Sequence, residues 1–348
     1  MRILIVQTSF LGDVVLSTPV FAAIRKHFPD AHVTVMVRPE SAAILAGHPA
    51  IDEVLVDDKH GATHGWGTWR TIRQLREHRF DLVVSLHKSF RTAWLLAAAR
   101  IPRRIGFRES TGWFLFHRTT RRDKSKHEVE RNLAILRCLD LEPRDHVAPP
   151  YVVCTTATRA DFRAMLSARG VEPGRVLIGI APGSAWATKR WTLEGYAALL
   201  RDVQAKLDAV PLLLGAKADM EYARAVQRAA GDIGINLVGQ TTLPELVAAI
   251  DQCAVLVTND SAPLHIAVAR DTPVVAIFGP TTPSMGFGPF TQRATVVEKD
   301  LSCRPCSRHG GATCPIATHA CMKDIGADEV LAALQRHLDA DARRASAQ

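Results

Sequence analysis

The feature that most constrains the fold is a regular alternation of short apolar runs with stretches of helical spacing. Apolar runs of this length, bounded by turn residues and separated by helices, are typical of strands in a parallel sheet that is covered by helices. A helix is predicted at about Thr18–His27, between the first two runs. The first half of the chain therefore predicts an open α/β sheet. Its apolar runs are RILIV, HVTVMV, EVLV, DLVVSL and RRIGF.

The same alternation restarts in the second half, after a polar, proline-bearing stretch at residues 142–150. A chain of 348 residues is also longer than most single domains. We predict a first domain at residues 1–155, a second at residues 171–327, and a helix with a tail at residues 328–348. Two open α/β sheets bind ligands beyond the carboxyl ends of their strands, so we expect the two domains to face each other across a cleft. The second set of runs is RVLIGI, VPLLLGA, GINLVGQ, CAVLV and PVVAIFGP.

The charge balance favours an anionic partner. The chain has 43 Lys and Arg against 35 Asp and Glu, a formal net charge of +8. Nucleic acid, a phosphorylated sugar and an anionic lipid surface would all fit this balance. The opening MRILIVQTSF lacks the apolar core and the cleavage site of a secretory signal, and AWLLAAA is far shorter than the ~20 residues of a membrane-spanning helix. We therefore expect a cytoplasmic protein without a membrane span.

Seven cysteines in a cytoplasmic chain of this length argue against a disulfide framework. Four of them, Cys303, Cys306, Cys314 and Cys321, lie close together in the sequence, and the first two form a CxxC pair. A zinc site would use such a pair, but the other two cysteines are not spaced as CxxC. A zinc site and reduced structural thiols are both possible, and the irregular spacing favours the thiols.

The turn TNDSAPLH, Thr258–His265, connects a predicted buried strand, CAVLV, to a predicted short helix. A helix N-terminus carries a partial positive charge and unpaired N–H groups, so a strand-to-helix turn at a sheet edge is suited to binding phosphate. Alternatively, Asp260 or Ser261 caps the helix and has no other role. This stretch alone does not decide between the two interpretations.

The loop APGSAWATKRW follows the first predicted strand of the second half. Gly183 and Ser184 allow a tight turn with exposed backbone amides, and Lys189 and Arg190 supply cations that a diphosphate would attract. The loop does not match the Walker pattern, so a P-loop NTPase is not expected. The alternative is a solvated basic loop.

The loop SFLGDVVLSTP follows the first predicted strand of the first half. Gly12 permits a close approach to the next helix, and Asp13 lies at the start of that helix, where capping alone would explain an aspartate. All three loops leave the carboxyl ends of predicted strands. We therefore expect them to converge on the cleft, which favours a binding site over three independent turns.

Several separate motifs, in the same order along nearly the whole chain, resemble the lipopolysaccharide heptosyltransferases. The likeness is closest to heptosyltransferase II. One departure is visible: these proteins usually have Gly where this chain has Ala262, which narrows the room for a phosphate at the turn. The motifs are ILIVQTSFLGDVVLSTPVFAAIRKHFP, PGSAWATKRWTLEGYAAL, LLGAKADMEYA and VTNDSAPLHIAVARDTPVVAIFGPTTP.

The resemblance implies a GT-B fold, in which two Rossmann-like open-sheet domains face each other across a cleft. It implies an inverting, metal-independent transfer of heptose from ADP-heptose to the inner core of lipopolysaccharide, without a cofactor. At matching positions Asp13 would be the general base and Lys189 would hold the donor diphosphate, so both would be catalytic. Glu221 would bind the ribose hydroxyls, and His265 would either touch the sugar or pack beneath the turn. The full expected donor site is Gly12, Gly183, Ser184, Lys189, Glu221, Asp260, Ser261, Ala262 and His265.

The residue types suit this chemistry without the resemblance. Glycosyl transfer passes through an oxocarbenium-like state, so the acceptor hydroxyl needs a base while charge grows on the departing diphosphate. Residues 100–131 hold ten Lys or Arg against four acids, which favours an anionic acceptor and contact with an anionic membrane. We therefore expect a peripheral protein at the inner face of the inner membrane. The expected acceptor site is Lys88, Arg91, Arg121 and Arg131.

Metal-dependent transferases hold a divalent ion with a DxD pair of carboxylates. The nearest candidates are the pair Asp57 and Asp58 and the DAD sequence at residues 339–341. We interpret both as solvated surface, so no metal ligand is predicted. Lys189 and the helix N-terminus would supply the positive charge instead.

Two rival functions are considered. A sugar-nucleotide epimerase shares the two-domain fold but needs no basic acceptor face. A non-catalytic anion-binding module would use the basic surface for nucleic acid, but no RNA-binding or helix-turn-helix signature is present, so nucleic acid is not expected. The glycine-punctuated loop GATHGWGTW, residues 61–69, either closes over the acceptor sugar or is a surface connection with its aromatics packed below, and we favour the lid.

Overall fold

The chain forms two compact units, Met1–Val153 and Cys154–Gln348, in a computed structural model that describes residues 1–58 and 66–346. The first part of the predicted lid at residues 61–69 lies outside the described residues, so the lid stays a prediction. No helix in the described ranges combines the length and the apolar character that crossing a bilayer requires.

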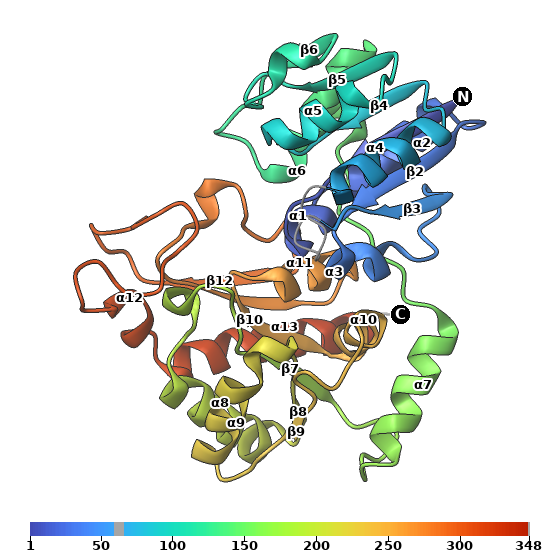
Figure 1. Cartoon of the computed structure of the whole chain (residues 1–348). Coiled ribbons are helices and arrows are strands. Elements are labelled where there is room, and N and C mark those ends of the chain that lie inside the picture. The colour runs from blue at the N-terminus through green and yellow to red at the C-terminus, as the bar shows by residue number, and fades with distance from the viewer. Residues whose placement is uncertain (59–65, 347–348) are drawn as a thin grey trace. The chain divides into compact units, whose positions relative to one another are not determined.

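The first unit is built on a six-stranded sheet in the order β3-β2-β1-β4-β5-β6, and every pair of neighbouring strands is parallel (Figure 1). β1 is the centre of the sheet, since β2 and β4 both pair with it. The strands are β1 (Arg2–Val6), β2 (His32–Val37), β3 (Glu53–Val56), β4 (Leu82–Ser85), β5 (Arg103–Phe107) and β6 (Arg118–Thr120).

Helices cover both faces of this sheet. Leu4 and Val6 pack against Ile72 and Leu96 of two helices, while Ile5 points to the opposite face and is equally buried. Burial of each such side chain contributes ~1.5–3 kcal/mol. The helices are α1 (Leu11–Val15), α2 (Thr18–His27), α3 (Pro39–Ala42), α4 (Trp66–Glu77), α5 (Phe90–Ala98) and α6 (Glu128–Leu133), with 3₁₀ turns η1 (Ala43–Leu45), η2 (Trp113–Leu115), η3 (Ala134–Leu139) and η4 (Pro143–His146).

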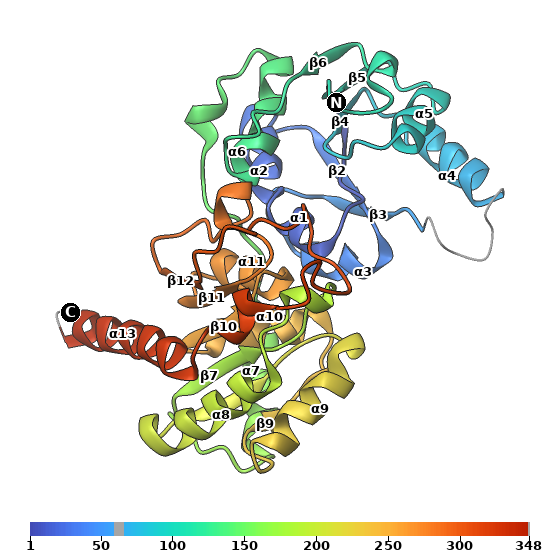
Figure 2. The same cartoon turned by 90° about the vertical axis from the view of Figure 1, so that its left-hand side faces the viewer.

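The second unit repeats this architecture with a parallel sheet in the order β12-β11-β10-β7-β8-β9 (Figure 2). The order reverses at β7, so β10 and β8 lie on its two sides. The strands are β7 (Leu177–Ala181), β8 (Val210–Leu213), β9 (Ile235–Asn236), β10 (Val255–Asn259), β11 (Val274–Phe278) and β12 (Ala294–Glu298).

One face of the second sheet packs against α8, α9 and α13. Ile180 and Val257 of the sheet share a buried cluster with Tyr196 of α8, Val226 of α9 and Leu334 of α13. The helices are α7 (Thr156–Ser167), α8 (Leu193–Leu207), α9 (Met220–Ala229), α10 (Leu243–Gln252), α11 (Ala262–Ala269), α12 (Ala320–Lys323) and α13 (Ala327–Ser346), with 3₁₀ turns η5 (Ala187–Lys189), η6 (Lys217–Asp219) and η7 (Pro283–Met285).

The predicted α/β class and the predicted helix at Thr18–His27 are confirmed, because each apolar run forms a strand of a parallel sheet. Two strands, β6 and β12, had no apolar run to predict them. β6 is only three residues long and is polar, and β12 begins with partly exposed residues. Both lie at an edge of their sheet, where only one neighbour is needed and the apolar signal is weak.

Candidate active site

The carboxyl ends of β11, β10, β7 and β8 meet at one edge of the second sheet, because these strands are parallel neighbours. The loop at residues 182–192 follows β7, and the turn at Asp260 and Ser261 follows β10. Two of the three loops that the sequence singled out therefore lie side by side. This placement results from the strand order and needs no bound ligand.

Asn259, the last residue of β10, joins these two loops. Its side chain is fully buried, and its amide donates hydrogen bonds to the carbonyls of Pro182 (2.9 Å) and Gly183 (3.2 Å). Its carbonyl oxygen accepts from the backbone N–H of Trp191 and from the hydroxyl of Tyr196, both at 3.0 Å. The predicted strand ended before Asn259, which was interpreted as one of several polar turn residues, and this role was missed.

Lys189 and Asp260 form an ion pair at the carboxyl edge. The Lys189 Nζ donates to Oδ2 of Asp260 at 2.6 Å, and the same oxygen accepts from the hydroxyl of Thr281 at 2.7 Å. Lys189 and Asp260 are 12% and 8% exposed, so water screens this pair weakly. Asp260 therefore fixes the ammonium group in place, and Thr281, which follows β11, fixes Asp260. Thr281 was not among the site residues predicted from the sequence.

The start of α11 shows that helix capping does not explain the turn. Ser261 is the N-cap residue, but its side chain makes no capping hydrogen bond, and the carboxylate of Asp260 is used by Lys189 and Thr281. The capping interpretation of these two residues is therefore wrong. Ala262 is the first residue of α11, and His265, one turn further, is buried.

The loop after β7 approaches the loop after β8 closely at Gly183. A Cβ at this position would lie 2.2 Å from the carboxylate carbon of Asp219, so a larger residue would displace the Asp219 side chain. Ser184 is buried, and its carbonyl accepts two hydrogen bonds from Arg190, at 3.1 and 3.0 Å. Arg190 therefore supports the loop itself. Glu221 is exposed in the first turn of α9, and its proposed contact with ribose stays a prediction.

The segment Leu301–Met322, which carries the four clustered cysteines, packs against the same edge. The Arg304 guanidinium donates to backbone carbonyls at the end of β11 and beyond it, including that of Thr281 at 2.9 Å. On the other side, Thr188 exchanges hydrogen bonds with the backbone of Gly311, and Nε2 of His319 donates to the carbonyl of Thr188 at 2.8 Å. The segment thus supports Lys189 from one side and Asp260 from the other.

The cysteines of this segment are unoxidised in the structure. Burial raises the pKa of Cys321 to about 11, which keeps it a neutral thiol. In the described part of the chain, no group of three or more His, Cys, Asp or Glu is arranged to hold a metal ion. The expectation of reduced structural thiols in this segment stays a prediction.

Asp13 lies in the short helix α1, which follows the central strand β1 of the first unit. It is not the N-cap residue, which is Phe10, but its carboxylate accepts a hydrogen bond from the backbone N–H of Phe10. The Asp13 carbonyl accepts a hydrogen bond from Ser17 at 2.7 Å, and Ser17 accepts one from Gln7 at 2.9 Å. This buried network fixes α1 relative to the end of β1. Gly12 lies beside Asp13 and is partly exposed.

The environment of Asp13 makes its carboxylate more basic than usual. Burial is the largest cause, the charge of Glu128 adds to it, and together they raise the pKa of Asp13 to about 6. The hydrogen bond with Phe10 and the positive charges of Arg122 and Lys88 act in the opposite direction and are weaker. Although part of the side chain remains accessible, its surroundings disfavour the charged form. A carboxylate tuned in this way can accept a proton near neutral pH.

The predicted acceptor residue Arg91 is engaged within the first unit. Its guanidinium makes a two-pronged contact with the carboxylate of Asp57, at 2.6 and 3.0 Å, and Asp57 is almost fully buried. The interpretation of Asp57 as solvated surface is therefore wrong, because Arg91 compensates its charge below the surface. Asp58 is exposed, as expected. Lys88 is partly exposed, and its charge acts on Asp13.

Arg131 is engaged in the same way. It donates to Glu128 and to the backbone of Asp123 and Lys124, so it holds the preceding loop. Glu128 also pairs with Arg122, and all three side chains are largely buried. Arg121, by contrast, is exposed beyond the end of β6. Of the four predicted acceptor residues, Arg91 and Arg131 are therefore held by buried acids, while Arg121 is exposed and Lys88 is partly exposed.

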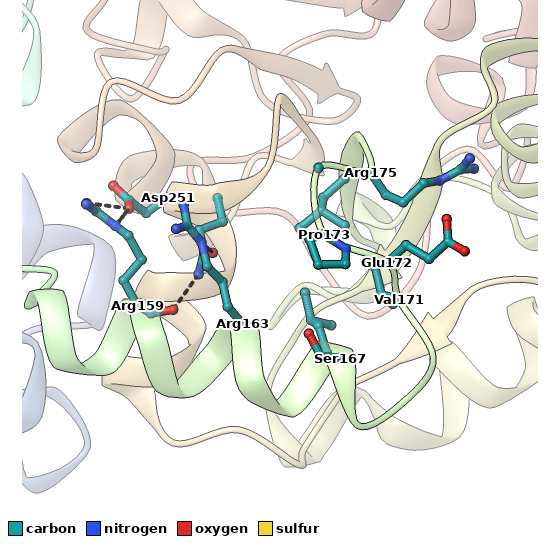
Figure 3. Close-up of a pocket in the computed structure, with 12 residues that line it drawn as sticks. Arg159, Arg163, Ser167, Val171, Glu172, Pro173, Arg175 and Asp251 are labelled. Atoms are coloured by element: carbon teal, nitrogen blue, oxygen red, sulfur yellow. Dashed lines mark hydrogen bonds and ion pairs between the residues drawn. The ribbon is translucent and has the colours of Figure 1, made fainter.

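A pocket of about 640 Å³ lies elsewhere in the second unit, between α7, the loop before β7 and the end of α10 (Figure 3). Leu177, the first residue of β7, lines it, so the pocket belongs to the amino edge of the sheet. Arg159 donates to Asp251 at 2.8 Å, and Arg163 donates to Gln252 at 2.7 Å. No predicted site residue lines this pocket, and its polar side chains largely satisfy one another.

The Asn259 network predicts a large effect on stability. Asn259→Ala should lower the free energy of unfolding by about 3 kcal/mol, because it leaves the Trp191 N–H and the Tyr196 hydroxyl buried without a partner. Thermal and denaturant unfolding would measure the loss. Asn236→Ala is the matched control, since Asn236 is only partly buried and its side chain contacts Gln227 and Val238. Equal losses in the two variants would contradict a central role for Asn259.

The known proteins that are similar to this chain are named as heptosyltransferases or as members of glycosyl transferase family 9. A lipooligosaccharide heptosyltransferase 2 from Haemophilus ducreyi is 30% identical over 314 residues, which cover 85% of this chain and 88% of that protein. A glycosyl transferase family 9 structure from Veillonella parvula is 26% identical, with a TM-score of 0.86 over 97% of both chains. The structure of ADP-heptose LPS heptosyltransferase II from E. coli is 26% identical, with a TM-score of 0.82 over 98% of this chain and 99% of that one.

These structural neighbours, together with the two parallel six-stranded sheets, confirm the predicted GT-B fold class. The family model described as glycosyltransferase family 9 (heptosyltransferase) matches residues 68–315, which is most of the chain. The protein therefore belongs to glycosyltransferase family 9, the heptosyltransferases, and is an enzyme of that family.

Proposed function

We propose that the protein transfers heptose from ADP-heptose to the inner core of lipopolysaccharide, with inversion at the anomeric carbon and without a metal ion. Family membership and the named activity of the E. coli relative support the donor and the acceptor. The observation that carries the proposal is the position of Lys189. Its ammonium group is held by Asp260, directly before the start of α11, at the carboxyl edge where open α/β sheets bind ligands.

In this proposal the donor diphosphate lies between Lys189 and the first turn of α11. An ammonium group has three N–H donors, and the contact with Asp260 uses one, so two remain for phosphate oxygens. The backbone N–H groups at Ser261 and Ala262 would add donors, and the helix dipole favours negative charge there. Gly183 and Ser184 would border the same space. Asp260 would thus position the cation without neutralising the whole site.

Asp13 would act as the general base. It would take the proton from the acceptor hydroxyl while the oxygen bonds to the anomeric carbon and the bond from that carbon to the ADP oxygen breaks. Attack from the face opposite to ADP inverts the configuration. The negative charge that grows on ADP would be stabilised by Lys189 and by the start of α11. The raised pKa of Asp13 suits this role, because the base must be ionised before the reaction and able to hold a proton afterwards.

Lys88 and Arg121 would attract the anionic groups of the acceptor, while Arg91 and Arg131 would shape the site through Asp57 and Glu128. The acceptor of such a reaction is anchored in a membrane. The protein would therefore act at the cytoplasmic face of the inner membrane, as a peripheral protein. The sugar-nucleotide epimerase is not favoured, since the family and the relatives named above are heptosyltransferases. A purely anion-binding role would not require the tuned carboxylate of Asp13.

The proposed base can be tested by substitution and by pH. Asp13→Asn should lower turnover by roughly two to four orders of magnitude, the usual contribution of a positioned base, while ADP binding is retained. In the parent, turnover should fall as the pH drops through about 6, because Asp13 becomes protonated there. Steady-state rates between pH 5 and about 8.5 would measure both effects. The residual rate of the Asp13→Asn variant should lack this pH dependence.

The control for this experiment is Asp30→Asn, which removes an exposed carboxylate from the same unit. The raised pKa of Asp13 means that the fold disfavours its ionised form. The stability that the protonated carboxyl contributes is therefore lost as the pH rises from the pKa of Asp13 in the unfolded chain through about 6, its pKa in the folded chain. The neutral amide introduced by Asp13→Asn should therefore not destabilise the protein at pH 7 through loss of charge. Normal turnover in the Asp13 variant would show that Asp13 is not the general base and has only its structural contact with Phe10.

The proposed donor site predicts weaker ADP binding when Lys189 is replaced. Lys189→Ala should cost about 1.5 to 3 kcal/mol of binding free energy, the range for a hydrogen bond to a charged group. Added salt should shrink the difference, since a cation is removed. Calorimetry with ADP measures both, and Lys206→Ala, at the exposed end of α8, is the control. Unchanged ADP affinity in a folded Lys189 variant would place the donor elsewhere.

The metal-free mechanism predicts that turnover survives chelation. EDTA should leave the rate within about twofold of the untreated enzyme, because Lys189 and the start of α11 supply the positive charge opposite the leaving group. The unfolding temperature should be followed in the same samples, so that any loss of a structural ion at the cysteines is recognised. A lost rate that magnesium or manganese restores would contradict this mechanism.

A further inference from the structure

Of the exposed aromatic side chains of the first unit, four lie on two neighbouring elements. Phe90 and Trp94 belong to α5, which Figure 1 labels, and Trp113 and Phe114 belong to η2. They are 49%, 39%, 45% and 61% exposed, respectively. Because so much aromatic surface normally becomes buried on folding or binding, these residues, termed the aromatic patch, indicate a contact surface.

The aromatic patch is continuous. Phe90 and Trp94 are four residues apart and share one side of α5. The ring of Phe90 lies 6.4 Å from that of Phe114, centroid to centroid, and the ring of Phe114 lies 6.3 Å from that of Trp113. The four side chains thus form one row across two elements.

The turn that carries Trp113 and Phe114 is firmly attached. The Thr111 N–H and the Ser110 hydroxyl both donate to the carbonyl of Lys88, at 3.1 and 3.2 Å. Gly112 packs so closely on α5 that an added Cβ would lie 2.5 Å from Cβ of Ala93. The aromatic rings are therefore presented by a fixed backbone, and their exposure does not result from a loose loop.

Positive charge borders the aromatic patch. The guanidinium of Arg108 lies 5.3 Å from the centroid of Trp113, and the Arg108 backbone pairs with Thr120, next to Arg121. Within the described residues, neither arginine forms an ion pair with an acid. The neighbouring acid Glu109 accepts hydrogen bonds from the backbone N–H of Arg122. Aromatic rings beside uncompensated arginines are the combination that binds the interface of an anionic bilayer.

We propose that the aromatic patch inserts into the interfacial region of an anionic lipid bilayer and thereby anchors the enzyme beside its acceptor. The inference rests on the proposed function, because a lipid-anchored acceptor must reach the site while its lipid stays in the bilayer. Lys88, proposed to contact the acceptor, is joined through its carbonyl to the turn that carries the patch. A second copy of the chain is a poorer occupant, since a symmetric contact would bring Arg108 and Arg121 close to their own equivalents.

The test measures vesicle binding without donor or acceptor. Flotation and tryptophan fluorescence would compare the parent with the double variant Phe90→Ser/Phe114→Ser, using phosphatidylcholine vesicles with and without phosphatidylglycerol. The parent should bind the anionic vesicles more tightly, with a blue shift of its tryptophan emission. The double variant should bind about tenfold or more weakly, since two large apolar side chains no longer enter the interface. Arg108→Gln should weaken binding to the anionic vesicles only, and less so at high salt.

Tyr151→Ser is the matched control, because Tyr151 is an aromatic residue of the same unit, 44% exposed, outside the patch. It should bind vesicles like the parent. Thermal unfolding would confirm that each variant is folded. If the double variant is not folded, Trp113→Ser takes its place. Equal vesicle binding by the parent and the folded patch variant would overturn the proposal. So would a dimeric parent, by sedimentation, that becomes monomeric in the variant.

A second measurement separates this proposal from the proposed function. With ADP-heptose and a water-soluble core oligosaccharide, the double variant should keep the parent's turnover, whereas with vesicle-embedded acceptor its turnover should fall about tenfold. If the parent transfers no heptose to either acceptor, the proposed function fails whatever the vesicles show. If the double variant loses turnover equally on both acceptors, the aromatic patch acts in the site and not as a membrane anchor.

Discussion

The side chain of Asn259 is the contact on which the candidate donor site depends. It is buried at the end of β10, and its two donors and two acceptor contacts join the loop after β7 to α8 and to β10 itself. The carbonyls of Pro182 and Gly183 would otherwise have to find partners in a region that excludes water. With the ends of this loop fixed by one side chain, Lys189 is presented toward Asp260.

The ion pair of Lys189 and Asp260 positions the Lys189 ammonium group more than it stabilises the fold. Removing two charges from water costs free energy that their attraction does not always repay, so a partly buried pair is weak support for a fold. Here the pair holds an ammonium group at the sheet edge with donors to spare. Thr281 and the segment Leu301–Met322 enclose the pair, and His319 fixes the backbone at Thr188 beside it. The cysteine segment therefore matters to the site through its backbone contacts.

The sequence predicted ten of the twelve strands that the structure describes, and it placed the candidate site residues just after the ends of three of them. Buried parallel strands are nearly continuous apolar runs, and the polar residues that follow them must meet at one edge, so Asp13, Lys189 and Asp260 could be identified as candidates. The partners of these residues could not. Thr281 and His319 come from segments far along the chain, and Arg91 pairs with Asp57, 34 residues earlier, which was interpreted as solvated surface. Apolar periodicity is local information and does not predict such pairs.

The position and the basicity of Asp13 are set by different parts of the first unit. Its position follows from α1, which Ser17 and Gln7 hold against β1. Its pKa follows from burial and from Glu128, whose carboxylate is shared with Arg122 and Arg131. Arg122, which pairs with Glu128, acts on the Asp13 pKa in the opposite direction, so the two charges partly offset each other at this carboxylate. The residues that follow β6 therefore affect the proton affinity of Asp13 through their charge, whereas Ser17 and Gln7 fix the position of its helix.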